Sequence, residues 1–160
     1  MRGDDMKYFD CQHKDHRIIN EQLQPRLYRL VEDWCGRWVW SDGSEINVFL
    51  KAGFLYDGMS IPNIGMSIAK LHPDSYREGV APHDLSYRSR GGRDKDKMQG
   101  CTITNQNGNR ICISKTQTDF ILKTTMDCMW ATKRQVRWVN LACRVGGWYH
   151  WGGPMPYQKK

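Results

Sequence analysis

Apolar and polar residues alternate between Leu27 and Leu55, and this pattern predicts β-strands in the first part of the chain. Two apolar runs, at 38–40 and 46–50, flank a polar turn at 41–44 that contains Asp and Gly. Apolar runs around such a turn are typical of an antiparallel hairpin. The first part of the chain is therefore expected to form a small antiparallel sheet.

After a short last strand at 53–56, the pattern changes toward helices. Residues 73–76 suit a helix start, but Pro82 lacks a backbone N–H and clashes with the preceding helical turn. Because proline is tolerated best at the first helical position, Pro82 is expected to begin a new helix. His83 and Asp84 would then lie in its first turn.

A second hairpin is predicted between the helices. Segments 101–104 and 111–113 are apolar or β-branched, and the polar stretch between them contains Asn107-Gly108. This hairpin is expected to be an insertion.

Two further helices have recognisable starts. Ser114 is expected to cap a helix that runs through Asp119 toward Trp130, and Thr132 is expected to cap a second. The second helix is predicted to end at Gly146-Gly147 and to carry three apolar residues on one side, namely Val136, Val139 and Cys143.

These elements predict a single α+β domain over residues 1–160, because a chain of this length fits one domain. A small antiparallel β-sheet from the N-terminal hairpins is expected to pack on two or three helices, with an inserted β-hairpin. Residues 1–22 are expected to form an extended N-terminal segment, and residues 152–160 a flexible tail.

The net charge of +7 favours anionic partners such as phosphorylated ligands, acidic lipid surfaces or nucleic acid. The basic residues are scattered, so most are expected on a solvated surface. Nucleic-acid binding is not favoured, because the aromatic and basic residues at 130–138 fit one amphipathic helix equally well. No apolar run reaches the ~18 residues of a membrane span, and the first ten residues are charged rather than signal-like, so a soluble protein made in the cytoplasm is expected.

Six cysteines occur without a CxxC pair, and reduced, largely buried thiols are expected. Segment 11–16 contains one cysteine and two histidines, so mixed ligands for a metal ion are conceivable there, but a solvated terminal segment is the simpler interpretation.

The residues best suited to catalysis or metal binding are His83, Asp84, Tyr87 and Asp119. A neutral imidazole can take a proton from water near pH 7, and a carboxylate on its other nitrogen fixes the tautomer and stabilises the cation that forms. A single histidine is more often structural than catalytic, so the combination matters more than any one member.

Four segments together resemble an uncharacterised family found mainly in bacteriophages, whose motifs are GFxTDGASIP, HDxLY, a helical AD pair and a late VRxxG element. In this chain they correspond to 53–62, 83–88, 118–120 and 144–148. The resemblance covers roughly Leu27 to Trp151 and implies phage origin and shared architecture, but no activity. The chain departs from the pattern at Tyr56, Met59 and Pro82.

The HDxxY motif, the upstream loop and the later aspartate also have a distant similarity to bacterial phospholipase A(2). This resemblance implies that His83 is a general base, that Asp119 orients it, and that Tyr87 donates a hydrogen bond to Asp119. It further implies that Asp84 binds calcium, with Asp57 or the carbonyl of Gly58 completing the shell. Proline and serine replace the cysteines that flank the motif in secreted phospholipases, and no glycine-rich calcium loop of the animal type is present.

Two functions follow from these patterns. The first is a phage-encoded, calcium-assisted hydrolase of phospholipid or other esters that uses the His83–Asp119 dyad. The alternative is a non-catalytic virion component, or a binding protein directed at the host, in which the same side chains form a buried polar network. Virion or host proteins would then be the partners, through aromatic side chains at an interface.

Overall fold

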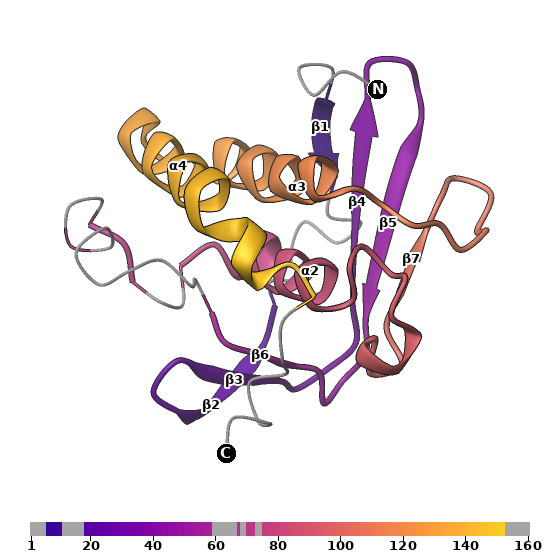
Figure 1. The fold of residues 1–160 in the computed structure, drawn as a ribbon, viewed down its shortest axis with the longest axis horizontal. Coiled ribbons are helices and arrows are strands. Elements are labelled where there is room, and N and C mark those ends of the chain that lie inside the picture. The colour runs from indigo at the N-terminus through magenta and orange to yellow at the C-terminus, as the bar shows by residue number, and fades with distance from the viewer. Residues whose placement is uncertain (1–5, 11–17, 59–66, 68–69, 73–74, 153–160) are drawn as a thin grey trace.

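The computed structural model describes residues 6–10, 18–58, 67, 70–72 and 75–152 and shows an α+β fold, as predicted (Figure 1). The elements are β1 (Met6–Asp10), β2 (Asn20–Gln24), β3 (Leu27–Leu30), β4 (Trp34–Trp40), β5 (Glu45–Leu50), β6 (Leu55–Tyr56), α2 (Arg77–Arg88), the 3-10 helix η1 (Lys95–Lys97), β7 (Thr102–Thr104), α3 (Lys115–Cys128) and α4 (Lys133–His150).

The strands form two antiparallel sheets, one with the order β1-β4-β5-β7 and one with the order β2-β3-β6. The predicted hairpin is β4–β5, with Trp38 opposite Ile46. Its turn closes with a hydrogen bond from the Trp40 amide to the Ser44 carbonyl, and Gly43 adopts a φ of 81° that favours glycine. The alternation of buried and exposed residues seen in the sequence therefore corresponds to the two faces of this sheet.

The inserted hairpin forms only in part. Its first arm is β7, which pairs with β5 and so extends the four-stranded sheet. The second arm contributes an isolated bridge between Thr104 and Arg110 and a hydrogen bond from the Ile111 amide to the Ile103 carbonyl. The segment is thus an edge of the main sheet rather than a separate excursion.

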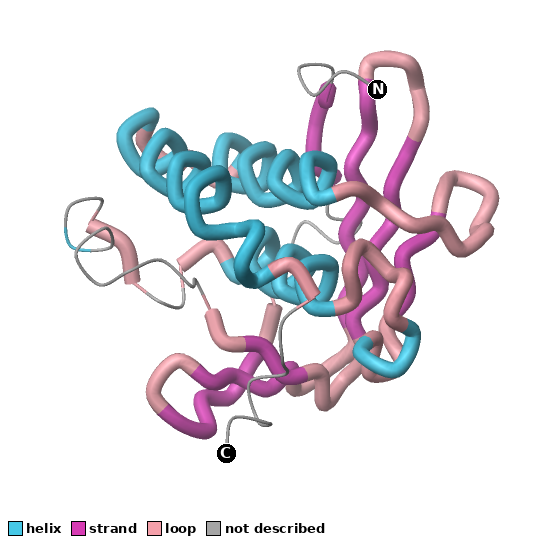
Figure 2. The backbone as a smooth tube through the Cα atoms, viewed as in Figure 1, coloured by secondary structure: helices cyan, strands magenta, loops and turns pink. Residues whose placement is uncertain are grey.

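The helices pack together beside the four-stranded sheet, and their apolar sides meet the sheet in one core (Figures 1 and 2). Trp38 of β4 is fully buried, and its Nε1 donates a hydrogen bond of 3.0 Å to Oγ1 of Thr125 on α3. Leu85 of α2 and Ile121 of α3 are also fully buried. The core thereby fixes α2 and α3 side by side.

The prediction that Pro82 begins a helix is wrong. Helix α2 begins at Arg77, after Tyr76 in a left-handed conformation, and continues through Pro82 to Arg88. A proline inside a helix costs about 3 kcal/mol, whereas burial of a single Val or Leu side chain contributes about 1.5–3 kcal/mol. Val80 and Leu85 on the same helix are both buried in the core, so tertiary packing offsets the missing hydrogen bond.

Both predicted helix caps are present as capping boxes. The Ser114 hydroxyl accepts a hydrogen bond from the Gln117 amide, and Thr132 makes the same contact with Gln135. The predicted end of the last helix at Gly146-Gly147 is wrong, because α4 continues to His150. Gly147 is a close-packing position inside the helix, as described below.

The predicted extended N-terminal segment contributes β1, which pairs with β4, and β2, which pairs with β3. The segment around Cys11–His16 and the tail after Gly152 lie outside the described residues. Among the cysteines that are described, none forms a disulfide; Cys101 is buried, but Cys112 and Cys128 are exposed, contrary to the expectation of largely buried thiols. Within the same residues, no helix is long and apolar enough to cross a bilayer.

Candidate functional site

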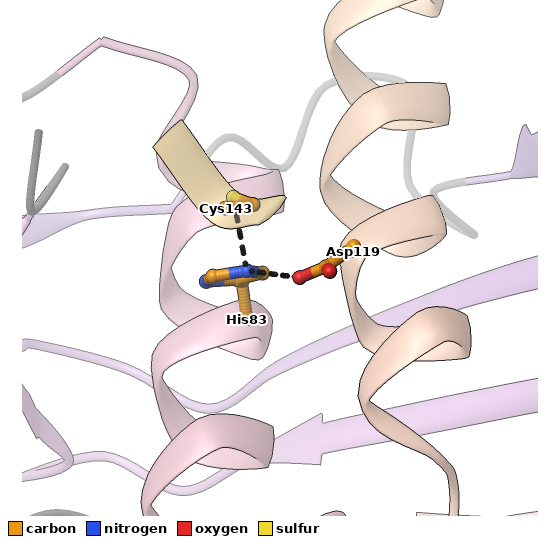
Figure 3. A group of neighbouring side chains, drawn as sticks. All are labelled: His83, Asp119 and Cys143. Atoms are coloured by element: carbon orange, nitrogen blue, oxygen red, sulfur yellow. Dashed lines mark hydrogen bonds and ion pairs between the residues drawn. The ribbon is translucent and has the colours of Figure 1, made fainter. Parts of the chain in front are cut away.

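Three helices bring the candidate catalytic residues together. His83 and Tyr87 lie one turn apart on α2, and Asp119 lies on the neighbouring α3. Cys143 approaches from α4, and Figure 3 shows the imidazole between the thiol and the carboxylate. The site therefore depends on contacts between residues that are distant in sequence.

Asp119 is held by three donors. Its Oδ1 lies 3.3 Å from Nε2 of His83 and accepts a hydrogen bond of 2.5 Å from the Tyr87 hydroxyl. Its Oδ2 accepts a hydrogen bond of 2.7 Å from Nζ of Lys115. Burial raises the pKa of Asp119, but the hydrogen bonds from His83, Lys115 and Tyr87 outweigh it and the net pKa is lowered. Asp119 is thus an ionised acceptor at neutral pH.

This arrangement defines the tautomer of His83. An ionised carboxylate can only accept, so Nε2 of His83 carries the proton directed at Asp119. Nδ1 is then the ring nitrogen with a free lone pair. The imidazole stacks on the Tyr87 ring at 4.1 Å between centroids, and its side chain is 12% exposed. His83 is thus mostly buried but reaches the surface.

Lys115 connects α3 to α4. Its Nζ bonds Asp119 and also donates a hydrogen bond of 3.0 Å to the carbonyl of Cys143. The sequence analysis missed this lysine, although its i,i+4 spacing from Asp119 is a detectable signal.

Gly147 allows α4 to approach the site. A Cβ atom at this position would overlap the Tyr87 hydroxyl and lie 2.9 Å from Nζ of Lys115, so a larger residue cannot fit without displacement. Trp151 makes a T-shaped contact with the Tyr87 ring, with 5.2 Å between centroids and an angle of 81°. Tyr87 is thus enclosed, and burial together with its hydrogen bond to Asp119 raises its pKa far above the ordinary value.

Cys143 is the second residue that the sequence analysis did not assign to the site. Its Sγ lies 3.7 Å from Nε2 of His83, and burial raises the pKa of the thiol to about 12. The thiol and the Asp119 carboxylate face the same ring nitrogen. A Cys–His–Asp triad needs them on opposite nitrogens, so Cys143 is not placed as an activated nucleophile.

The residues predicted to bind calcium form a separate cluster with Arg88. Oδ2 of Asp84 accepts a hydrogen bond of 3.0 Å from the Asp57 amide, and Nη2 of Arg88 lies 2.7 Å from Oδ1 of Asp57 and 3.6 Å from Oδ2 of Asp84. Arg88 also donates to the Leu55 carbonyl. Burial, with the nearby Asp57 carboxylate, raises the pKa of Asp84, while Arg88 opposes this.

This cluster does not fit calcium as it is arranged. Calcium takes six to eight oxygens at 2.3–2.6 Å, whereas here one guanidinium already lies against both carboxylates. Gly58 has a φ of 67°, and the loop after it lies outside the described residues. We therefore derive no catalytic step through calcium, and calcium dependence stays a prediction of the resemblance.

Comparison with known proteins assigns neither a family nor a function to this chain. No family model, curated protein or solved structure matches the chain. The function must therefore be argued from the site itself.

Proposed function

We propose that this chain is a hydrolase in which His83 acts as the general base that activates water, with phospholipid esters as the substrate. The observation that carries the proposal is the contact of 3.3 Å between Nε2 of His83 and Oδ1 of Asp119, which leaves Nδ1 to accept a proton.

The proposed chemistry uses only side chains of this site. Nδ1 of His83 takes a proton from water as the oxygen attacks the ester carbonyl, and Asp119 stabilises the imidazolium that forms. The imidazolium then gives this proton to the departing alkoxide as the ester C–O bond breaks, which releases a fatty acid and an alcohol and restores the neutral ring. Tyr87 and Lys115 hold the carboxylate in place, so it need not reorganise during the reaction. General-base catalysis of this kind typically contributes about 100- to 10,000-fold.

The choice of a lipid substrate is supported by the surface of α4. Leu141 and Val145 lie one turn apart and are 50% and 69% exposed, and Trp130 before the helix is 93% exposed. Exposed arginines lie on the same helix, at 134, 137 and 144. Apolar and aromatic side chains beside basic ones suit an anionic lipid surface, and the net charge of +7 has the matching sign.

The test is hydrolysis of anionic phospholipid vesicles by the wild type and by His83→Gln, with calcium and with chelator. We expect the variant to lose at least about 100-fold in turnover, because glutamine cannot act as the base. His72→Gln is the matched control, since His72 is exposed and outside the site. Equal turnover in wild type and His83→Gln would overturn the proposal, and wild-type activity on soluble esters alone would overturn the lipid substrate.

A second candidate is the non-catalytic phage component. It is favoured by the low exposure of His83 and Asp119, at 12% and 15%, and by the way their hydrogen bonds connect helices. In that case the wild type is inactive, and His83→Gln lowers the free energy of unfolding by a few kcal/mol, as expected for a broken buried network. Denaturant unfolding of both proteins, beside the turnover assay, separates the two candidates.

A further inference from the structure

The side chains of His83, Asp119 and Cys143 offer three different ligand atoms at one point. All three atoms lie within 4.8 Å of one another, and each comes from a different helix (Figure 3). Imidazole, thiolate and carboxylate are the three ligand types that zinc uses in proteins.

Two of the distances between these atoms are close to those of a tetrahedral site. With the usual zinc–ligand distances, neighbouring ligand atoms lie roughly 3.3–3.6 Å apart. Nε2 of His83 lies 3.3 Å from Oδ1 of Asp119 and 3.7 Å from Sγ of Cys143. These two distances between ligand atoms therefore need to change only slightly for the ion to bind.

We propose that His83, Asp119 and Cys143 bind a zinc-class divalent ion. Three protein ligands leave the fourth tetrahedral position for water or another small donor. Binding does not depend on the proposed hydrolase function, but it competes with it, since the ion takes the nitrogen through which Asp119 orients His83.

The surroundings of Asp119 support this assignment. Metal-bound carboxylates are usually held by further hydrogen bonds, and here Tyr87 donates to Oδ1 while Lys115 donates to Oδ2. Lys115 also carries a positive charge beside the ionised Asp119 carboxylate and near Cys143, whose thiol becomes anionic when the ion binds. The ion must displace the thiol proton of Cys143, as zinc commonly does, and the proton on Nε2 of His83 must move to Nδ1 so that Nε2 offers its lone pair.

The same three ligands predict which metal ions the site prefers. Calcium and magnesium prefer oxygen ligands throughout, whereas imidazole and thiolate select zinc, cobalt and related ions. Zinc should therefore bind in the presence of excess calcium or magnesium.

The experiment is a titration of the metal-free full chain with zinc by calorimetry and with cobalt by absorption spectroscopy. We expect one ion per chain and a thiolate-to-cobalt charge-transfer band in the near ultraviolet. Because the ion ties three helices together, zinc at about a hundred times its Kd should raise the Tm by roughly 5–10 °C.

Variants identify the ligands. Cys143→Ser should abolish the charge-transfer band and weaken binding by at least about 10- to 100-fold, and Tyr87→Phe should weaken it by about 10-fold. Cys11→Ser, Cys112→Ser and Cys128→Ser are the matched controls and should retain the band. Circular dichroism without metal checks that each variant is folded, and His83→Gln tests the site independently of the thiol.

Absence of binding, or a band that survives in Cys143→Ser and disappears in one of the control variants, would overturn the proposal. Ions bound only by cysteines outside the site give that second outcome. Hydrolysis is measured on protein freed of zinc-class ions, both with calcium and with chelator, so failure of the hydrolase proposal leaves this result unaffected, and the reverse also holds.

Discussion

Tyr87 shows how one side chain organises the site. Its hydroxyl donates to Asp119, its ring stacks on His83, and Trp151 packs edge-on against it. Because its pKa is raised by burial and by Asp119, the hydroxyl stays protonated and remains a donor at all physiological pH values.

Tyr87→Phe removes this donor and leaves the ring in place. Hydrogen bonds to charged groups contribute about 1.5–3 kcal/mol, and we expect a fall of that size in the free energy of unfolding, measured with urea. Tyr76→Phe is the matched control, because the Tyr76 hydroxyl bonds the neutral Gln135 and its loss should cost only about 0.5–1.5 kcal/mol. Equal losses in the two variants would contradict the role given to Asp119.

Gly147→Ala tests the close approach of α4. In an unconstrained helix interior, alanine is more favourable than glycine by about 1 kcal/mol. Here the new methyl group would overlap the Tyr87 hydroxyl, and overpacking typically costs about 1–3 kcal/mol. We therefore expect a lower Tm than in the wild type, whereas a higher Tm would show that the contact is not tight.

At the scale of elements, the sequence predicted turns and helix caps correctly where the contact joins residues only a few positions apart. The β4–β5 turn and the helix caps at Ser114 and Thr132 were all predicted from nearby residues. Pro82 and Gly147 were misjudged because distant packing, rather than local preference, determines the conformation there.

The cap of α3 matters for the site because that helix carries Asp119 and Lys115. Ser114→Ala removes the hydroxyl that accepts from the Gln117 amide and should cost about 1 kcal/mol. Ser114→Asp is the matched control and should retain most of the stability, since aspartate is an equally good cap. Denaturant unfolding measures both, and an unchanged Ser114→Ala variant would show that the cap is dispensable.

At the scale of the whole molecule, two buried carboxyls make stability depend on pH in opposite ways. The pKa of Asp119 in the folded protein lies below its ordinary value of 3.8, so its contribution is fully present above that value and is lost as the pH falls through the folded pKa. The pKa of Asp84 is raised, so ionised Asp84 lowers stability above its folded pKa, and this cost disappears as the pH falls from the folded pKa toward 3.8.

Asp119→Asn should therefore flatten the curve of unfolding free energy against pH below pH 3.8, and Asp84→Asn should flatten it above pH 3.8. Urea unfolding across the acid range measures both curves. The assignment fails if the two substitutions alter the same pH interval.

The sequence by itself determined the α+β class, the central hairpin, the helix caps and the identity of the dyad residues, because each rests on periodicity, on a short local motif or on a motif resemblance. Only the tertiary structure decided that Pro82 lies inside α2, that Arg88 pairs with Asp57 and Asp84, and that Cys143 meets His83. Those outcomes depend on how helices and loops distant in sequence pack together. No local pattern specifies that packing.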